Sequence, residues 1–276
     1  MPVQRRLFLF FALLLLLVGS LLACDALPSI RYNGTPITAS PTTNPLDPSP
    51  DRWTTVEPGV EIRSEKWTSP GNNEDTVIIT RLNLHRVRLQ VGYQPTHPMT
   101  MSQWQKATGA RVLMNGGYFD SDDRPTGLLI SNGQQVGSSY NGFGGMLAVD
   151  ALGNVSLRSL SQQPYDPNTD QFEQATQSSP MLMIGGKRTQ FNTNAASQRR
   201  SIVAIDTRGR LLLIASPNAA FTLDELADLL ASSDLSIKDA LNLDGGASTG
   251  LYVSSGNTQK VAVDSVTPLP IMIIVK

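Results

Sequence analysis

The chain has 276 residues and a formal net charge of -1 at pH 7, with 22 Lys and Arg against 23 Asp and Glu. This balance argues against a nucleic-acid-binding surface, which needs a clear excess of basic side chains on one face. Cys24 is the only cysteine, so the sequence excludes an intramolecular disulfide bond and a cysteine-based metal site.

The N-terminus carries the features of a targeting segment. Arg5 and Arg6 precede an apolar run over residues 7–18, and the small and apolar residues Leu-Leu-Ala stand directly before Cys24. This ending resembles the bacterial lipobox, in which the signal is cleaved before a cysteine that then carries a lipid such as palmitate. We therefore predict a lipoprotein signal peptide over residues 1–23 and an exported protein held on the outer face of a bacterial membrane. An uncleaved transmembrane anchor is the alternative, because the run approaches the roughly 20 residues that span a bilayer.

Residues 24–58 are predicted to form a disordered tether. They are rich in Ser, Thr and Asn, with closely spaced prolines at positions 36, 41, 45, 48 and 50. Such a segment cannot bury enough apolar area to offset its ordering entropy. The remaining residues, 59–276, are long enough for one substantial core, so we expect a single domain there.

The first half of this domain has the pattern of a series of strands. Alternating apolar residues from Val60 to Val91 predict long strands with one buried face. Thr100 is placed to cap a short helix over residues 101–108, and the apolar run at 111–114 predicts a buried strand. Turn residues bound further short strands at 127–130, 145–149 and 155–160. The polar residues 161–179 predict a long surface loop that borders a cleft.

The second half contains a hairpin, a helix and the closing strands. Apolar residues 202–205 and 211–215 flank Thr-Arg-Gly-Arg, which is the pattern of a β-hairpin. Thr222 and Glu225 form a capping box for a helix whose apolar stripe ends near Ser232. Further strands are expected at 181–184, 241–243, 251–253, 261–263 and 269–275. Together the pattern predicts the α+β class, as a single mixed, largely antiparallel sheet with a few packed helices.

Two carboxylates follow apolar runs in glycine-containing turns. Asp244 lies within Leu-Asp-Gly-Gly, and Asp120 ends Asn-Gly-Gly-Tyr-Phe-Asp. Glycine permits turns that larger residues resist, so each turn delivers a carboxylate at a strand end. The chain has only two histidines, so acid-base chemistry falls to carboxylates, and two of them across a sugar can cleave a glycosidic bond. Solvated loop acids, or a calcium site formed by Asp120, Asp122 and Asp123, are the alternative.

A serine hydrolase motif overlaps the turn that contains Asp244. Residues 246–250 read Gly-Ala-Ser-Thr-Gly and match Gly-x-Ser-x-Gly. That motif needs a helix directly after the serine and a histidine later in the chain, whereas residues 251–253 favour a strand and both histidines lie upstream. We therefore set aside a nucleophilic Ser248. The strand, turn and strand around Asp244 also fit an ordinary hairpin.

Arg200 precedes the apolar residues 202–205, and a guanidinium suits bidentate recognition of phosphate or carboxylate. Consecutive strand residues face opposite ways, so one of Arg199 and Arg200 is expected to point inward. Arg200 completes an ordered set of motifs with Asn-Gly-Gly-Tyr-Phe at 115–119, the hairpin turn at 207–210, the capped helix and Asn-Leu-Asp-Gly-Gly-Ala-Ser at 242–248. From about residue 75 to the C-terminus, this set resembles the phosphodiester glycosidase domain family.

The resemblance implies hydrolysis of a sugar-1-phosphodiester between the anomeric carbon and its oxygen. It implies Asp244 as base or nucleophile, Arg200 as stabiliser of the departing phosphate and Asn115 as a further catalytic group. The resemblance implies that the substrate is bound by Gly116, Gly117, Tyr118, Asp120, Gly245, Gly246 and Ser248. Gly116 and Gly245 would bind it through their backbone amides. Ser248 would also orient the Asp244 carboxylate. The chain departs from the family pattern at Ala247, in place of glycine, and at Ser201, in place of threonine.

The expected protein is thus a glycosidase that acts on phosphate-linked glycans of the cell envelope or outside the cell. A glycan-binding lipoprotein that keeps the pocket without turnover is the alternative. The expected partners are a phosphate-linked carbohydrate and, through the lipid on Cys24, a membrane, with no nucleic acid, and we expect a monomer. No cofactor is required, although the acidic loop at 120–123 leaves room for calcium.

Overall fold

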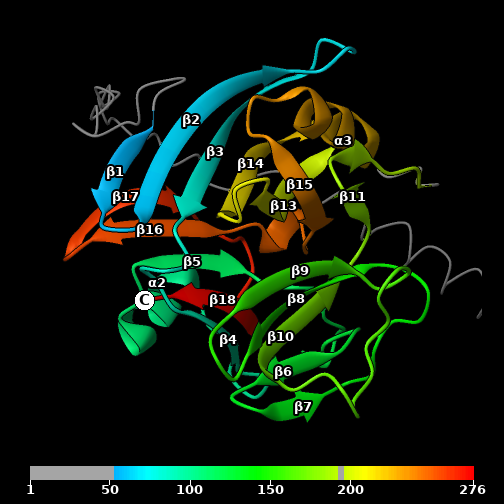
Figure 1. Cartoon of the computed structure of the whole chain (residues 1–276). Coiled ribbons are helices and arrows are strands. Elements are labelled where there is room, and N and C mark those ends of the chain that lie inside the picture. The colour runs from blue at the N-terminus through cyan, green and yellow to red at the C-terminus, as the bar shows by residue number, and fades with distance from the viewer. Residues whose placement is uncertain (1–52, 192–195) are drawn as a thin grey trace, which may run out of the picture. The chain divides into compact units, whose positions relative to one another are not determined.

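A computed structural model describes residues 53–191 and 196–276 (Figure 1). They belong to one compact unit of the chain, Thr43–Lys276. The predicted signal peptide, the lipidation site Cys24 and most of the predicted tether lie outside these ranges. Neither described helix is both long enough and apolar enough to cross a bilayer.

The largest sheet has eight strands, which adjoin in the order β1-β2-β3-β14-β13-β15-β11-β12. These strands are β1 (Thr54–Glu57), β2 (Val60–Thr68), β3 (Glu74–Leu82), β11 (Met181–Ile184), β12 (Lys187–Arg188), β13 (Gln198–Asp206), β14 (Leu211–Phe221) and β15 (Ile237–Asn242). The predicted hairpin is confirmed, because β13 and β14 pair antiparallel, with Ile202 opposite Ile214 and Ile205 opposite Leu211.

Two further sheets have five strands each, and every pairing between described strands is antiparallel. One has the order β7-β6-β10-β8-β9 and consists of β6 (Leu129–Ser131), β7 (Gln134–Val136), β8 (Gly145–Asp150), β9 (Val155–Ser159) and β10 (Phe172–Ser178). The other has the order β17-β16-β5-β18-β4 and consists of β4 (Leu89–Tyr93), β5 (Val112–Asn115), β16 (Leu251–Ser255), β17 (Thr258–Val263) and β18 (Ile271–Val275).

The two described α-helices cover the outer faces of sheets. Helix α3 (Leu223–Ser232) begins with the predicted capping box, and its Leu226 and Leu230 pack on the eight-stranded sheet (Figure 1). Helix α2 (Met101–Thr108) is capped by Thr100 as predicted, and its Trp104 packs on the sheet of β5 and β18. The largest buried cluster joins side chains from all three sheets, so the sheets share one core.

The prediction of a single sheet is wrong, because the described strands form three sheets. A twisted open sheet rarely exceeds about 10 strands before it splits or closes. The described chain contains more strands than that, and it passes from one sheet to another at several loops. One of these loops follows β15, so the strand, turn and strand around Asp244 are not a hairpin. The α+β class and the largely antiparallel pairing hold.

The predicted surface loop at 161–179 is also wrong in part, because β10 lies at the centre of its sheet. The side chains of Gln174 and Gln177 are buried and take the place of backbone hydrogen-bond partners. The Oε1 atom of Gln177 accepts hydrogen bonds from the amides of Leu128 at 3.2 Å and Tyr140 at 2.8 Å. The Oε1 atom of Gln174 accepts a hydrogen bond from the amide of Val91 at 3.0 Å. Buried polar groups are stable when they are hydrogen-bonded in this way.

The domain begins before the predicted boundary at residue 59. Strand β1 pairs with β2 through Thr54 opposite Ile62 and Glu57 opposite Val60. The two strands are joined by a tight turn at Pro58 and Gly59, and Gly59 has a φ of 91°. Pro58 therefore belongs to a hairpin turn, where proline is common, and does not extend the tether.

Candidate active site

The two glycine-containing turns meet at the ends of strands from two different sheets. The turn at 116–120 follows β5, and the turn at 243–250 follows β15 and contains a short 3-10 helix, η2 (Gly246–Ser248). The backbone amide of Asp244 donates to the carbonyl oxygen of Gly116 at 3.2 Å, and the amide of Asn115 donates to that of Gly250 at 3.3 Å. The sequence motifs that lie far apart in the chain thus form one site.

Asn115 holds this junction together. Its Nδ2 donates to the carbonyl oxygen of Asp244 at 2.7 Å and to that of Gly116 at 3.4 Å. Its Oδ1 accepts from the Ser201 hydroxyl at 2.7 Å and from the Gly250 amide at 3.0 Å. The full hydrogen-bonding capacity of a side-chain amide is therefore used inside the protein. Asn115 positions the site and has no atom left to bind a substrate.

The glycines after Asn115 are required by close packing. A Cβ atom on Gly116 would stand 2.3 Å from Cγ2 of Ile271, and one on Gly117 would stand 2.1 Å from the carbonyl oxygen of Gln177. The Gly116 amide donates to the carbonyl oxygen of Ile271 at 3.1 Å. This amide is therefore occupied by the protein and is not free for the expected contact with a substrate.

Asp244 is half-buried and held in a defined orientation. Its Oδ1 accepts from the Gly245 amide at 2.9 Å, so this amide too is occupied by the protein. Burial raises the pKa of the Asp244 carboxyl, whereas the Ser248 hydroxyl and the Gly245 amide act in the opposite direction. The side chain of Ser248 is buried, at 6% exposed. Ser248 thus favours the charged form of Asp244, in line with its predicted orienting role.

The charges of Asp244 and Arg200 both act on the phenol of Tyr118. Burial raises the pKa of the Tyr118 phenol, the negative charge of Asp244 raises it further, and Arg200 lowers it. The phenol oxygen accepts from Nδ2 of Asn242 at 2.8 Å. Tyr118 therefore stays protonated at neutral pH, and its hydroxyl hydrogen is available to a ligand.

Arg200 is the member of its pair that points inward, at 5% exposed. Its Nε donates to the carbonyl oxygen of Phe221 at 3.3 Å, and one terminal nitrogen donates to that of Ala196 at 2.7 Å. Within the described ranges no carboxylate forms an ion pair with it. Burial lowers the pKa of the guanidinium, and Tyr118 opposes this shift. A buried cation without an anionic partner is costly, which favours a role in binding an anion.

Asp120 does not join this group. It is exposed, and its Oδ1 accepts from the amides of Asp122 at 2.9 Å and Arg124 at 3.0 Å, which closes its own loop. No hydrogen bond between described residues connects it to Asp244. No three His, Cys, Asp or Glu side chains in residues 53–191 and 196–276 gather to bind a metal ion, so the acidic loop at 120–123 forms no such group.

The remaining predicted residues have structural explanations. Gly246 has a φ of 59°, a conformation that favours glycine, whereas Ala247 is exposed and is not among the non-glycine residues with positive φ. Alanine is therefore tolerated where the family pattern has glycine. Ser201 keeps the hydroxyl that binds Asn115. Ser248 is followed by strand β16 and not by a helix, which agrees with the rejection of a nucleophile elbow.

Sequence reasoning assigned no role to Asn242. This residue is fully buried, donates to Tyr118 and to the carbonyl oxygen of Ser179 at 3.0 Å, and its Oδ1 has no partner in the described ranges. The available signal was its spacing of two from Asp244, since residues i and i+2 share one side of an extended segment.

Comparisons with known proteins identify the family of the chain. Residues 108–276, more than half of the chain, match the phosphodiester glycosidase family. An uncharacterized protein of Escherichia coli (strain K12), YigE, is 29% identical over 184 residues, which cover 55% of this chain and 69% of that protein.

Two solved structures share the fold. The catalytic domain of zebrafish N-acetylglucosamine-1-phosphodiester alpha-N-acetylglucosaminidase matches with a TM-score of 0.63 and 20% identity, over 80% of this chain and 84% of that one. A hypothetical protein from Synechocystis matches with a TM-score of 0.61 and 16% identity, over 83% of this chain and 64% of that one. At these identities the structural likeness concerns the fold.

Proposed function

Because this chain belongs to the phosphodiester glycosidase family, we propose that it hydrolyses sugar-1-phosphodiesters at the bond between the anomeric carbon and oxygen. The observation that carries the proposal is the buried Arg200, which forms no ion pair with any described carboxylate and lies near Tyr118 and the turn that contains Asp244. The Cδ atom of Arg200 lies 3.9 Å from the place that a Cβ on Gly245 would occupy. The stem of the Arg200 side chain therefore lies against the turn that contains Asp244.

The chemistry of the leaving group suits a site with one carboxylate. Ordinary glycosidases use a second carboxyl group to protonate the leaving oxygen. In a sugar-1-phosphodiester the leaving group is a phosphate monoester, whose second pKa is about 6, so it can depart without a proton. The Asp120 carboxylate closes its own loop, and a departure without a proton does not need it as an acid. Arg200 stabilises the charge that develops on the departing phosphate.

Asp244 acts on the sugar side of the same bond. As a carboxylate it either activates the attacking water molecule or attacks the anomeric carbon itself. Tyr118 is a protonated phenol that donates a hydrogen bond to the substrate, and Asn242 fixes its hydroxyl at 2.8 Å. Asn115 and Ser248 are positioning residues. Asn115 holds the backbone of Asp244, and Ser248 favours its charged form.

We further propose that this activity serves glycans of the bacterial envelope or its surroundings, with the protein anchored by a lipid on Cys24. The support is the apolar run that ends in Leu-Leu-Ala-Cys, which lies outside the described residues. Metabolic labelling with a radioactive or clickable fatty acid tests this point. Incorporation into the wild type but not into Cys24→Ser is the expected result.

The test of the proposed reaction uses the full chain and a panel of sugar-1-phosphodiesters that differ in the sugar. Release of reducing sugar is followed for the wild type and for Asp244→Asn, and the fold of each is checked by circular dichroism. Release that falls at least roughly 10³-fold in Asp244→Asn is expected. Arg86→Gln, an exposed turn residue, serves as a control that keeps activity.

Two outcomes would contradict the proposal. Full activity in Asp244→Asn would remove the central role of this carboxylate. Binding of the phosphodiesters without release in the wild type, measured by titration calorimetry, would favour the alternative of a glycan-binding protein with the same pocket.

A further inference from the structure

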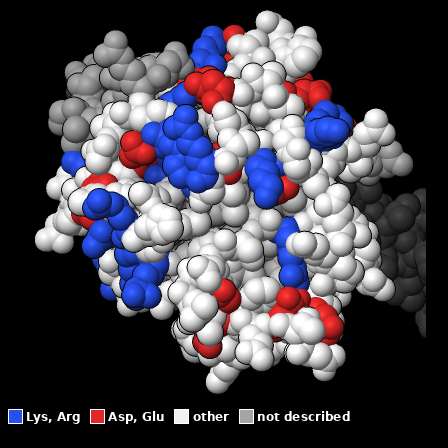
Figure 2. Space-filling model, viewed as in Figure 1, with Lys and Arg blue, Asp and Glu red and all other residues white. Residues whose placement is uncertain are grey.

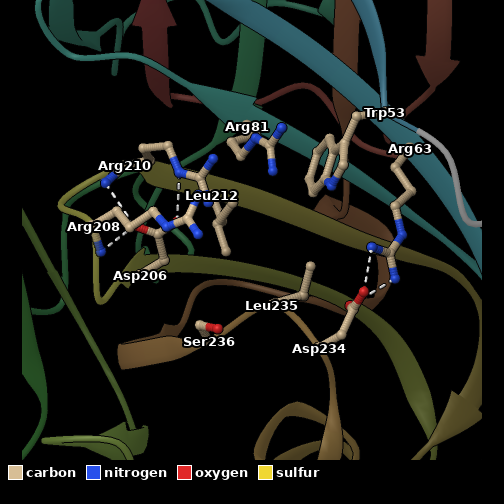
Figure 3. A pocket seen from close by; sticks show the side chains of 10 residues that line it. All are labelled: Trp53, Arg63, Arg81, Asp206, Arg208, Arg210, Leu212, Asp234, Leu235 and Ser236. Atoms are coloured by element: carbon tan, nitrogen blue, oxygen red, sulfur yellow. Dashed lines mark hydrogen bonds and ion pairs between the residues drawn. The ribbon is translucent and has the colours of Figure 1, made fainter.

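A second cationic group lies on the eight-stranded sheet, away from Asp244. A hollow of about 190 Å³ is lined by Trp53, Arg63, Arg81, Asp206, Arg208, Arg210, Leu212, Asp234, Leu235 and Ser236 (Figure 3). The lining holds four arginines and two aspartates, and Glu61 and Glu65 pair with Arg81 and Arg63, so the four guanidinium groups stand among four carboxylates. On the face shown in Figure 2, Lys and Arg side chains lie among Asp and Glu side chains and form no broad surface of one charge sign.

The four arginines differ in how many of their N–H donors form hydrogen bonds within the protein. Arg63 is nearly fully paired, with two hydrogen bonds to Asp234 at 2.9 and 2.8 Å and one to Glu65. Arg81 uses only Nε, which donates to Glu61 at 2.8 Å. The terminal nitrogens of Arg81 therefore form no hydrogen bond or ion pair with any described residue.

The hairpin between β13 and β14 supplies the other two arginines. Oδ1 of Asp206 accepts from the amides of Arg208 and Arg210, both at 2.9 Å, and its Oδ2 accepts from Nε of Arg210 at 2.7 Å. Asp206 is only 1% exposed, so these bonds fix the turn firmly. In the described ranges, the terminal nitrogens of Arg210 and the whole guanidinium of Arg208 are left without a protein partner.

The position of Arg81 is fixed as well. Its guanidinium carbon lies 3.7 Å from the centre of the Trp53 ring, a distance typical of a cation-π contact. In Figure 3, Arg81, Arg208 and Arg210 lie around one side of the hollow, and Leu212 and Leu235 add apolar surface. Arg81 and Arg210 are held in place and Arg208 is exposed beside them, and their donors without a described partner match the several oxygens of a phosphate group.

This hollow is separate from the candidate active site. Arg200 lies near the start of β13, and Asp206 is its last residue. Because a strand rises about 3.4 Å per residue, the span between them corresponds to roughly 20 Å. Asp206 pairs with Ile237 at the first end of β15, whereas Asn242, next to the Asp244 turn, is at the other end. The two sites therefore lie at opposite ends of the same strand pair.

We propose that the hollow lined by Arg81, Arg208 and Arg210 binds the phosphate group of a phosphate ester. Its volume and the neighbouring Trp53, Leu212 and Leu235 leave space for an organic substituent beside the phosphate. A soluble phosphate ester and a phospholipid headgroup share this chemistry. The site does not depend on the reaction proposed for Asp244.

Titration calorimetry on the full chain with glycerol 3-phosphate tests the soluble source. Arg208→Gln is the main variant, because Arg208 is exposed and its side chain has no partner that the fold needs. Arg208→Gln is expected to weaken binding roughly tenfold, the loss typical of one hydrogen bond between charged groups. The matched control Arg86→Gln, also an exposed turn arginine, and Asp244→Asn should bind like the wild type.

Sedimentation with phosphatidylglycerol–phosphatidylcholine vesicles tests the lipid source. A smaller bound fraction for Arg208→Gln than for Arg86→Gln, without a change in glycerol 3-phosphate binding, assigns the site to a headgroup. The proposal is overturned if Arg208→Gln and Arg86→Gln behave alike in both assays. It is also overturned if Asp244→Asn abolishes binding, because the phosphate would then occupy the active site.

Discussion

The side-chain amide of Asn115 donates to the backbone carbonyl oxygen of Asp244 at 2.7 Å, although 129 positions separate the two residues in the chain. Asn115 ends a strand of one sheet, and Asp244 follows a strand of another. A single side chain thus links two sheets at the point where the candidate catalytic carboxylate stands. Activity and stability should respond together when this link is removed.

Asn115→Ala is expected to lower both stability and turnover. It leaves the Ser201 hydroxyl and the Gly250 amide without their buried acceptor, which costs about 2–3 kcal/mol and several degrees in Tm. The Asp244 backbone is no longer held, so kcat should fall more than KM rises. Ser201→Ala removes one of these bonds and should show a smaller loss of both. Thermal unfolding and steady-state kinetics provide the measurement, and an Asn115→Ala protein with normal kcat would show that the link does not position Asp244.

The pH dependence of activity should report the environment of Asp244. Burial raises the pKa of this carboxyl, and the proposed reaction needs its charged form, so kcat/KM should decline below a pH higher than the usual aspartate value. The Ser248 hydroxyl counteracts the rise. Ser248→Ala should therefore move the acid limb of the profile to still higher pH.

A matched control for this shift is Ser254→Ala, which alters a buried serine on β16 that contacts Arg111. Its acid limb should coincide with that of the wild type. A limb that stays in place or moves to lower pH in Ser248→Ala would mean that Ser248 does not stabilise the charged carboxylate.

The same pKa shift has a consequence for stability. A carboxyl group whose pKa is raised by folding stabilises the fold below its unfolded pKa and loses that contribution as the pH rises through the folded value. At neutral pH the charged, half-buried Asp244 is therefore a cost to the fold. Asp244→Asn should be at least as stable as the wild type at pH 7, which separates lost chemistry from lost structure in the test of function.

Much of the fold and part of the site could be predicted from sequence. The capping residues Thr100 and Thr222 and the β13–β14 hairpin have local signals, and these elements are confirmed. The strand β10 has no such signal, because Gln174 and Gln177 look like loop residues until their buried partners are known. Local patterns also cannot show which strands share a sheet, since that depends on pairing between distant segments.

The candidate site shows the same division. The turn containing Asp244 and the basic residue Arg200 were recognisable as motifs, and the structure brings them together with Tyr118. Asp120 has the same local pattern as Asp244, yet its carboxylate closes its own loop. The amide of Asn115 looked like a substrate ligand because three of its four internal partners, Ser201, Asp244 and Gly250, are far away in sequence.

The ionised carboxylate of Glu225 should stabilise the fold at neutral pH and lose this contribution at acid pH. Its carboxylate accepts from the Thr222 amide at 2.9 Å, the Ser69 hydroxyl at 2.8 Å and Nδ2 of Asn73 at 2.9 Å. These bonds, the Thr222 amide foremost, lower its pKa from 4.5 to about 2. A lowered carboxyl pKa contributes stability above the unfolded value and loses it as the pH falls through the folded value.

Glu225→Gln keeps the capping box but removes the charge, so it should lower the Tm at pH 7, by the equivalent of about 0.5–1 kcal/mol for a lost negative charge at the helix N-terminus, and by less near pH 2. Thermal scans of both proteins between pH 7 and pH 2 provide the measurement. Glu173→Gln, an exposed glutamate, should give scans like those of the wild type. An equal Tm difference at both ends of the range would mean that the charge of Glu225 contributes nothing.

Arg200→Lys tests the residue that carries the proposed function. Lysine keeps the positive charge but loses the planar fork, and its ammonium cannot bind two phosphate oxygens in the same plane. If Arg200 stabilises charge on the departing phosphate, its contribution is larger in the transition state than in the bound substrate. Then kcat and kcat/KM should fall together, by roughly 10²-fold, on any sugar-1-phosphodiester that the wild type accepts.

Arg199→Lys is the matched control for this substitution. Arg199 is the neighbour in the strand, and its guanidinium binds the carbonyl oxygens of Pro217 at 2.9 Å and Asp264 at 2.8 Å. Its replacement should change Tm more than kcat. A rise in KM with unchanged kcat in Arg200→Lys would mean that Arg200 only binds the substrate, and equal kinetic losses in both variants would mean that it has no special place in the reaction. A leaving-group series separates these cases further, because the loss in Arg200→Lys should grow as the departing phosphate ester becomes more basic.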